Sequence, residues 1–190
     1  MPHRARILVV SATARELAAA DGWRTLLCGV GPVEAAAATA AEIARERPSI
    51  ILHVGIAGAR RPHSFAPAAL VIGSESRYDD LGVPAEWAPN TVITGQELVA
   101  AAQRALPTAV ALPIGTSARV GGTSGCDVEA MEGFGVLRAA QLARVPAVEI
   151  RAISNDIEET DRTRWHFDAA FEAIIAATPR VVTELLLHAN

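Results

Sequence analysis

The sequence predicts an α/β fold with a central sheet flanked by helices, and its periodicity and apolar content are the two observations behind this prediction. Short, continuously apolar segments alternate along the chain with longer segments of helical periodicity. Apolar residues make up 51% of the chain, which suits strands that are covered on both faces. With 190 residues the chain can bury a sizeable core, and we expect one domain spanning residues 1–190. Alternating strands and helices favour helical layers packed on a sheet.

The individual elements follow from the same patterns. Pro32 suits a first helical position, Asp127 is expected to cap the third helix with Glu129 in its first turn, and Pro179 is expected to kink or divide the last helix. Six segments have the character of buried strands: residues 6–10, 25–29, 49–54, 69–74, 110–114 and 147–154. Four segments have helical periodicity: residues 33–47, 95–106, 128–143 and 167–188.

Charge and composition exclude several classes of function. The net charge of -4 offers no basic surface for nucleic acid, and no segment approaches the ~18 apolar residues of a membrane span. Every basic residue is arginine, so no lysine is present for a Schiff base or a phosphate loop. Cys28 and Cys126 lack metal-ligand spacing and the histidines form no cluster, so we expect no metal, no cofactor and two buried free thiols. Free thiols are typical of a reducing compartment, which predicts a cytoplasmic protein.

Glycine-rich turns and a few polar residues mark candidate ligand contacts. The segments 29–32 and 55–59 each follow an apolar run, and ligands of open α/β sheets bind at the carboxyl ends of strands. Neither turn has the spacing of a dinucleotide or phosphate loop. Glu132 can hold sugar hydroxyls, Met131 can pack against a sugar face, and Asn155 can bind the edge of a heterocycle. The candidate substrate-binding residues are Ile56, Ala57, Gly58, Met131 and Glu132.

The order and spacing of several segments resemble the purine nucleoside phosphorylase and nucleosidase superfamily. In particular they resemble its bacterial nucleosidases, methylthioadenosine/S-adenosylhomocysteine nucleosidase and futalosine hydrolase. The resemblance implies a three-layer fold around a twisted mixed sheet, a small-molecule purine nucleoside as substrate, and a homodimer or larger homo-oligomer. The segments are Ser-Ala-Thr-Ala-Arg-Glu at 11–16, Gly-Val-Gly-Pro at 29–32, Val-Gly-Ile-Ala-Gly at 54–58, Ser-Arg-Tyr-Asp-Asp-Leu at 76–81, Val-Glu-Ala-Met-Glu-Gly at 128–133 and Arg-Ala-Ile-Ser-Asn at 151–155.

The resemblance also implies roles for three residues. Glu16 matches the carboxylate that activates the attacking water, and Glu132 matches the one that binds the ribose hydroxyls. Asn155 stands where the methylthioadenosine enzymes have the aspartic acid that protonates adenine. A neutral amide can donate to a 6-oxo group and accept from a ring N–H, as hypoxanthine requires. This departure favours hydrolysis of futalosine in menaquinone synthesis, as do the strings Tyr-Asp-Asp-Leu-Gly at 78–82 and Thr-Asp-Arg-Thr-Arg-Trp at 160–165.

Four further residues have open interpretations. Arg77 and Arg162 can pair with a substrate carboxylate or lie on the surface. Asp156 is one candidate for protonating the leaving base, beside solvent. Glu129 is expected on the surface or in support of the site, three residues before Glu132.

Three alternative functions remain open at this point. The nearest is hydrolysis of methylthioadenosine or adenosylhomocysteine. Phosphorolysis is disfavoured because residues 12–16 lack the Gly-Asp-Pro string of the phosphorylases, although Arg15 and the Arg60–Arg61 pair could bind phosphate. A non-catalytic nucleoside-binding module is disfavoured because binding alone does not require a water-activating carboxylate at Glu16.

Overall fold

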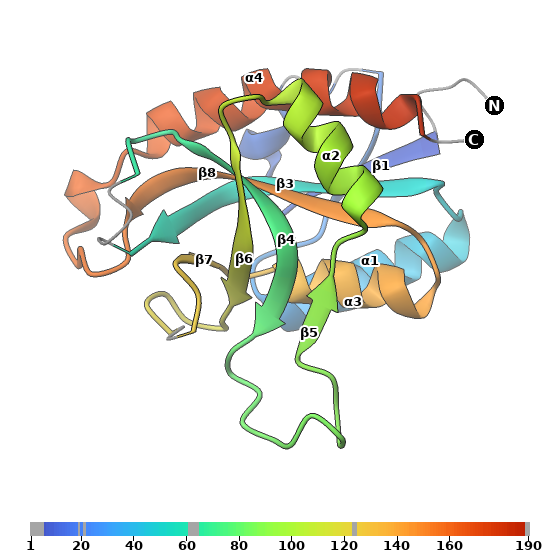
Figure 1. Ribbon diagram of the computed structural model, residues 1–190, viewed down its shortest axis with the longest axis horizontal. Helices are drawn as coiled ribbons and strands as arrows, with labels where there is room; N and C mark the ends of the chain where they lie inside the picture. Colours follow the sequence, from blue (N-terminus) through green and yellow to red (C-terminus); the bar gives the residue numbers. More distant parts are fainter. Residues whose placement is uncertain (1–5, 19, 21, 61–64, 123–124, 189–190) are drawn as a thin grey trace.

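The computed structural model describes residues 6–18, 20, 22–60, 65–122 and 125–188, and within them an eight-stranded mixed sheet lies between two helical layers (Figure 1). This arrangement confirms the predicted three-layer α/β fold. The strands are β1 (Ile7–Ser11), β2 (Arg24–Leu27), β3 (Ile50–Ala59), β4 (Leu70–Tyr78), β5 (Thr91–Ile93), β6 (Val110–Thr116), β7 (Val128–Ala130) and β8 (Ala147–Asp156). The helices are α1 (Pro32–Arg45), α2 (Gln96–Ala105), α3 (Gly133–Leu142) and α4 (Phe167–Leu186), with the 3-10 turns η2 (Ala14–Leu17) and η4 (Arg162–Arg164).

The sheet is organised around the long strand β3. Along one edge β3 pairs in parallel with β8, while its other edge pairs first with β1 and then, at Gly58 and Ala59, with the antiparallel β7. Strand β4 pairs with β8 and β6, and β6 pairs with β7. Strands β3, β8, β4, β6 and β7 therefore close into a ring, which brings the carboxyl ends of β3 and β8 beside β7 and the start of α3.

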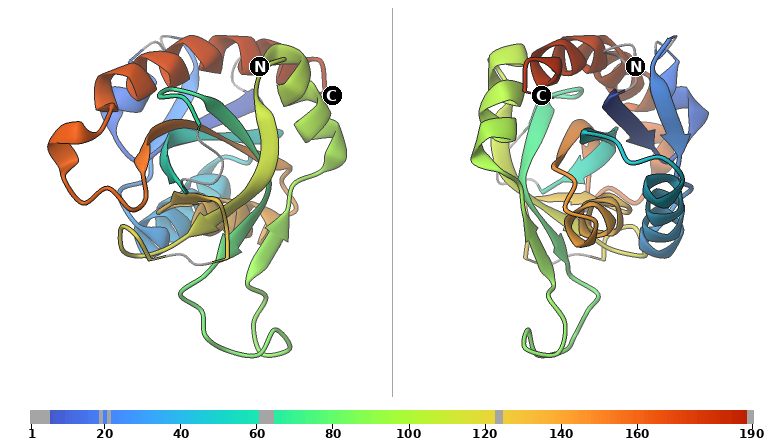
Figure 2. Two further views of the ribbon diagram at one scale, coloured as in Figure 1. Left: turned by 60° about the vertical axis from the view of Figure 1, so that its left-hand side comes forward. Right: turned by 90° about the vertical axis from the view of Figure 1, so that its right-hand side faces the viewer.

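Helices cover both faces of the sheet (Figure 2), and a cluster of buried apolar side chains lies between the sheet and the helices on each face. Val9 and Leu52 pack toward α2 and α4, whereas Leu8, Val10 and Ile51 pack toward α1 and α3. Because both faces of these strands are covered, alternate residues are equally apolar, which accounts for the continuous apolar runs in the sequence.

All ten predicted elements are present, but one of them was placed wrongly. The helix predicted over residues 128–143 begins at Gly133, because Val128–Ala130 pairs with β3 and β6 as β7. Asp127 therefore does not cap α3, and Glu129 lies in a strand rather than in a first helical turn. Pro32 begins α1 as predicted. Pro179 does not divide the last helix, because α4 is continuous around it.

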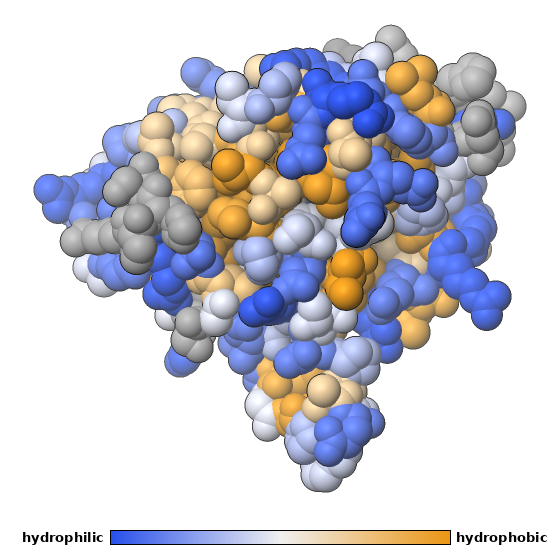
Figure 3. Space-filling view, viewed as in Figure 1, coloured by the Kyte–Doolittle hydropathy of each residue, from blue (hydrophilic) through white to orange (hydrophobic). Residues whose placement is uncertain are grey.

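The segment between β4 and β5 extends away from the body of the molecule (Figure 1). It carries apolar surface (Figure 3), and Val83 and Trp87 within it are 37% and 77% exposed. None of the helices in the described ranges is both long enough and apolar enough to cross a membrane.

We expect Gly135→Ala to destabilise the fold, because α1 and α3 touch at this glycine. A Cβ at residue 135 would lie 3.1 Å from the Ala36 backbone nitrogen and 3.3 Å from the Pro32 carbonyl carbon. Alanine favours an exposed helix by up to ~1 kcal/mol, but overpacking of rigid backbone costs roughly 1–3 kcal/mol. Urea unfolding measures the net effect, with Gly82→Ala as the control, since a Cβ there meets nothing within 4 Å. A more stable Gly135→Ala protein would contradict this account.

Candidate active site

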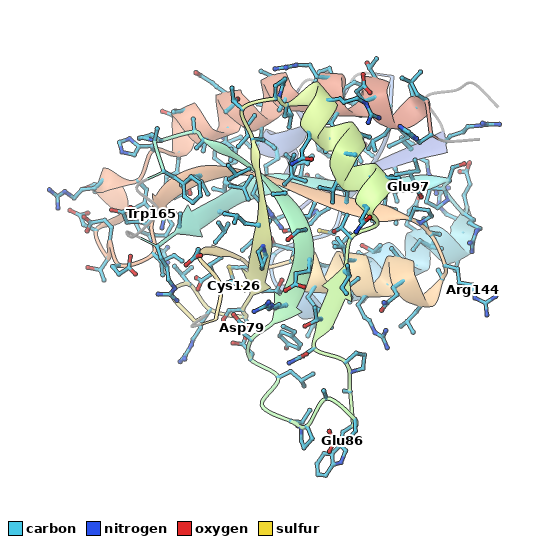
Figure 4. All side chains as sticks on the ribbon, viewed as in Figure 1. Asp79, Glu86, Glu97, Cys126, Arg144 and Trp165 are labelled. Atoms are coloured by element: carbon cyan, nitrogen blue, oxygen red, sulfur yellow. The ribbon has the colours of Figure 1, made fainter. Side chains whose placement is uncertain are left out.

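A pocket of about 210 Å³ opens at the carboxyl ends of β1, β3 and β8, beside β7 and the start of α3. Its wall combines three carboxylates, one arginine, one amide and apolar surface. Figure 4 shows Trp165, which also lines it, on the segment between β8 and α4. The lining residues are Ala12, Thr13, Glu16, Val30, Ile56, Ala57, Gly58, Val120, Glu129, Ala130, Met131, Glu132, Arg151, Ser154, Asn155 and Trp165.

Glu16 is held in a fixed position by the turn that follows β1. It lies in η2, where its Oε2 accepts hydrogen bonds from the Thr13 backbone N (2.7 Å) and from Thr13 Oγ1 (2.8 Å). The residue is only 4% exposed. Burial raises the pKa of the Glu16 carboxyl above its usual 4.5, while the Thr13 hydrogen bonds and the Arg151 charge oppose the rise. The result is an oriented carboxylate that takes up a proton more readily than an exposed glutamate.

Arg151 crosses the floor of the pocket and is itself buried, at 1% exposure. Its Nε donates to Glu149 Oε1 (2.7 Å), and its Nη2 faces His53 Nε2 (2.6 Å) and Glu132 Oε2 (3.4 Å). Burial works against its charge, but Glu149 and Glu132 hold the pKa of the guanidinium above its ordinary value. Gly55 is the register partner of Arg151, and a Cβ there would lie 3.2 Å from the guanidinium carbon. The missing side chain at residue 55 thus gives the arginine room to cross β3.

His53 contributes a neutral ring to this cluster. Arginine only donates hydrogen bonds, so Nε2 of His53 accepts from Arg151, and Nδ1 donates to the Val10 carbonyl oxygen at 3.1 Å. Burial, together with the Arg151 charge, holds the pKa of His53 well below 6.5. The ring therefore adds no positive charge to balance the carboxylates.

Glu132 joins three parts of the chain at the pocket wall. It is the residue that precedes α3, and its Oε1 accepts from the backbone N of Gly31 at 3.2 Å while Oε2 faces Arg151. Gly31 has a φ of 97°, which requires glycine in the turn after β2. The preceding residue, Met131, lines the same wall.

Asn155 presents its amide at the end of β8. Its Oδ1 accepts from Ser154 Oγ (2.8 Å) and its Nδ2 donates to the Asp156 backbone oxygen (2.9 Å). A Cβ at Gly58 would lie 3.0 Å from this Nδ2, so the amide occupies space that only glycine leaves open. An amide can make more than these two bonds, so one donor and one acceptor position are left for a ligand.

The other sequence-predicted residues are divided between the pocket and the surface. Ile56, Ala57 and Gly58 line the pocket, as does Glu129, which is 6% exposed and accepts a hydrogen bond from the Gly121 backbone N. Of the two expectations for Glu129, the surface position was wrong, because β7 is buried between β3 and β6, and a position in support of the site stays a prediction. Three of these residues, Arg77, Arg162 and Asp156, lie outside the pocket wall. Arg77 forms an ion pair with Glu75, and the guanidinium of Arg162 lies 5.7 Å from the Trp165 ring centre. Asp156 is exposed.

Four residues that build the site have no predicted role from the sequence: Thr13, His53, Glu149 and Arg151. Three of them carry a signal that is visible in the sequence. His53, Glu149 and Arg151 are polar residues inside apolar strands that are covered on both faces. A buried charge must be paired, so their presence predicts a polar cluster between β3 and β8.

The basic residues considered for phosphate binding have protein partners in the structure. Arg15 pairs with Asp168 and lies 4.2 Å from the Phe171 ring centre, and Arg60 pairs with Glu158.

Within the described ranges no group of three or more His, Cys, Asp or Glu residues is placed to hold a metal. Cys28 and Cys126 are free and buried, which confirms the expectation of two buried free thiols. Arg61, His3 and His63 lie outside the described residues.

Comparison with known proteins matches residues 24–187 to the family model described as the phosphorylase superfamily. A futalosine hydrolase from Streptomyces coelicolor is 31% identical over 200 aligned positions, which cover 87% of this chain and 80% of that protein. A methylthioadenosine/S-adenosylhomocysteine nucleosidase from Colwellia psychrerythraea in complex with adenine superposes with a TM-score of 0.79 at 22% identity, over 95% and 93% of the two chains. A futalosine hydrolase mutant from Helicobacter pylori superposes with a TM-score of 0.83 at 15% identity, over 95% and 99%.

The chain belongs to the phosphorylase superfamily. Within that superfamily it is an N-glycosyl hydrolase, as its curated relative is.

We expect Arg151→Met to destabilise the protein strongly at neutral pH. Breaking a buried ion pair by removing one partner costs roughly 3–5 kcal/mol, because Glu149 and Glu132 keep uncompensated charge. Arg151 opposes the rise that burial causes in the pKa of Glu149, so without the arginine this pKa is higher still in the folded state. The loss of stability therefore grows as the pH rises above the usual glutamate range and shrinks in acid. Urea unfolding at about pH 7.5 and about pH 5 measures this trend. Arg164→Met, which removes an exposed pair with Glu159, is the control and should cost below ~1 kcal/mol at both pH values.

Proposed function

We propose that this protein hydrolyses the N-glycosidic bond of futalosine and releases hypoxanthine, as a step in menaquinone biosynthesis. The observation that carries the proposal is the amide of Asn155 on the pocket wall, with one donor and one acceptor position left for a base. Hypoxanthine offers the complementary 6-oxo acceptor and a ring N–H donor. The futalosine hydrolase relative supports the same substrate.

Glu16 is proposed as the general base. The C1′–N9 bond breaks as its electron pair moves into the purine, and the sugar passes through an oxocarbenium-like state. Water then attacks C1′ while Glu16 takes one of its protons, and the departing base takes a proton from solvent, because Asp156 lies outside the pocket wall. Glu16 then returns its proton to solvent, which replaces the proton taken by the base, so the products are hypoxanthine and the free sugar and atoms and charge balance.

Glu132 is proposed to bind the ribose hydroxyls, with Met131 packed against the sugar. Both oxygens of Glu132 are already oriented by Gly31 and Arg151, so the carboxylate needs little reorganisation when a sugar binds. Ile56, Ala57 and Gly58 form the wall nearest Asn155 and bind the base through shape.

The charge of the pocket favours water over phosphate as the nucleophile. Glu16, Glu129 and Glu132 line it, and its basic lining residue, Arg151, is paired with Glu132 in the wall and with Glu149 beneath it. A phosphate dianion would be repelled by this wall, whereas a developing oxocarbenium cation would be stabilised. The site thus supports hydrolysis rather than phosphorolysis.

We also infer a homodimer or larger homo-oligomer in the cytoplasm. Val30 and Val120 line the pocket yet are 57% and 47% exposed, and Trp87 is exposed on the segment that extends from the body. These exposed apolar side chains are candidate contact residues of such an assembly. Sedimentation at several protein concentrations tests the assembly, and a monomer throughout would contradict it.

The substrate is tested by comparing hypoxanthine release from futalosine with adenine release from methylthioadenosine, each with and without phosphate. We expect phosphate-independent release and a higher kcat/KM for futalosine. Asn155→Asp should shift the ratio of the two kcat/KM values toward the 6-aminopurine, because an ionised carboxylate cannot donate to O6. An unchanged ratio would show that Asn155 does not select the base, and preference for methylthioadenosine by the wild type would favour that nucleosidase activity.

Glu16→Gln should lower kcat by roughly two to four orders of magnitude, the usual scale for a general base. Because burial raises the pKa of Glu16, the wild-type kcat/KM should fall on acidification through a pKa above 4.5. That acid limb should be absent in the variant, since the amide does not titrate. Hypoxanthine binding by calorimetry is the control for an intact pocket. Turnover close to wild type in the variant would refute the assignment.

A further inference from the structure

Glu149 lies beneath the pocket rather than in its wall, and it is fully buried. Its Oε1 accepts from Arg151 Nε at 2.7 Å, in the contact that sets the direction of the guanidinium plane. Its Oε2 makes no hydrogen bond of normal distance and angle among the described residues, although the Ser76 hydroxyl on β4 lies close enough to lower the pKa of the carboxyl. A buried carboxylate with one oxygen unpaired is costly, so a role in protein stability alone gives a poor account of it.

The first residue of α3 packs directly on this carboxylate. A Cβ at Gly133 would lie 2.6 Å from the Glu149 carboxyl carbon and closer still to both of its oxygens. Gly133 follows Glu132, so the backbone that carries the sugar-binding candidate rests on Glu149. The position of Arg151 and the position of Glu132 are therefore both coupled to one buried side chain.

Several groups face Glu149 from the surrounding elements. Arg151 lies on its own strand, Glu132 precedes α3, and the hydroxyl of Ser76 on β4 lies nearby. His53, its register partner on β3, contacts Arg151 as a neutral ring. Burial raises the pKa of Glu149, and Arg151 opposes that rise. The cluster thus sets one arginine against three carboxylates, counting Glu16, on which the Arg151 charge also acts.

We propose that Glu149 is a positioning residue for the hydrolytic reaction. It fixes the direction of the Arg151 guanidinium, and it sets how strongly the positive charge of Arg151 interacts with the carboxylates of Glu16 and Glu132. The absence of a side chain at Gly133 is what lets Glu149 occupy this place. The inference rests on the proposed function, because it assigns Glu149 a part in the reaction that Glu16 and Glu132 carry out.

The first test replaces the charge of Glu149 and keeps its size. We expect Glu149→Gln to lower kcat about tenfold to hundredfold, the scale of a small misplacement of reacting groups. With one negative charge removed, Arg151 stabilises ionised Glu16 more strongly, so the acid limb of kcat/KM should move to lower pH. Glu172→Gln, an exposed change on α4, should leave both quantities unchanged. A loss of activity with no displacement of the limb would overturn the charge part of the proposal.

The second test measures the coupling between Gly133 and Glu149. Gly133→Ala alone should reduce kcat as much as Glu149→Gln does, because the new methyl group displaces the carboxylate. In a Glu149→Ala background the methyl group has room, so the same substitution should cost less than about threefold. An equal factor in both backgrounds would overturn the proposed contact.

Four proteins, the wild type, Gly133→Ala, Glu149→Ala and the variant with both substitutions, distinguish a failure of this inference from a failure of the proposed function. If the wild type releases base from no purine nucleoside, the proposed function fails and the coupling is read instead from urea unfolding. Non-additive free energies of unfolding would then support the packing of Glu149 under Gly133, and additive ones would overturn it. Circular dichroism of each variant establishes that it is folded before either quantity is compared.

Discussion

The buried guanidinium of Arg151 is the interaction on which the rest of the site depends. It contacts Glu149, Glu132 and His53 at once, and its charge acts on Glu16. These partners come from β8, β3, the turn after β1 and the residue that precedes α3. Since an unpaired buried charge is costly, the cluster fixes how these elements meet and also orients the carboxylates proposed to carry the reaction.

The sheet topology makes this meeting possible. In the parallel register of β3 and β8, His53 lies opposite Glu149 and Gly55 opposite Arg151. Side chains alternate between the faces of a strand, so Glu149 and Arg151 point to the same side. A glycine opposite the arginine leaves space for it to reach across β3 toward the pocket. The closure of the ring through β7 then places Glu129 and Glu132 on the facing wall.

The sequence was sufficient to predict the helical layers and the sheet, but not the short strand β7 that joins β3 to β6 and closes the ring of strands. Long elements such as α4 and β8 have strong periodicity, whereas β7 has three residues and exists through its pairing with β3 and β6. For the same reason the sequence left a surface position open for Glu129, beside a position in support of the site. Glu16, Glu132 and Asn155 were predicted as site residues through the resemblance to a family. The local pattern alone would favour exposed helical charges at Glu16 and Glu132 and a turn residue at Asn155. Glu149 and Arg151 carried a physical signal, a charged pair inside an apolar strand, but the register that makes it informative is non-local.

The charge imbalance of the site connects its stability to its chemistry. One arginine and a neutral His53 face three buried carboxylates, and burial raises the pKa of both Glu16 and Glu149. Ionised carboxylates in such a place destabilise the folded protein as the pH rises above the usual glutamate range. The same negative potential stabilises a sugar cation as the glycosidic bond breaks, and it repels phosphate from C1′. A second positive charge would stabilise the folded protein and weaken the negative potential that favours hydrolysis. The charge imbalance is therefore the feature that suits this pocket to water as the nucleophile.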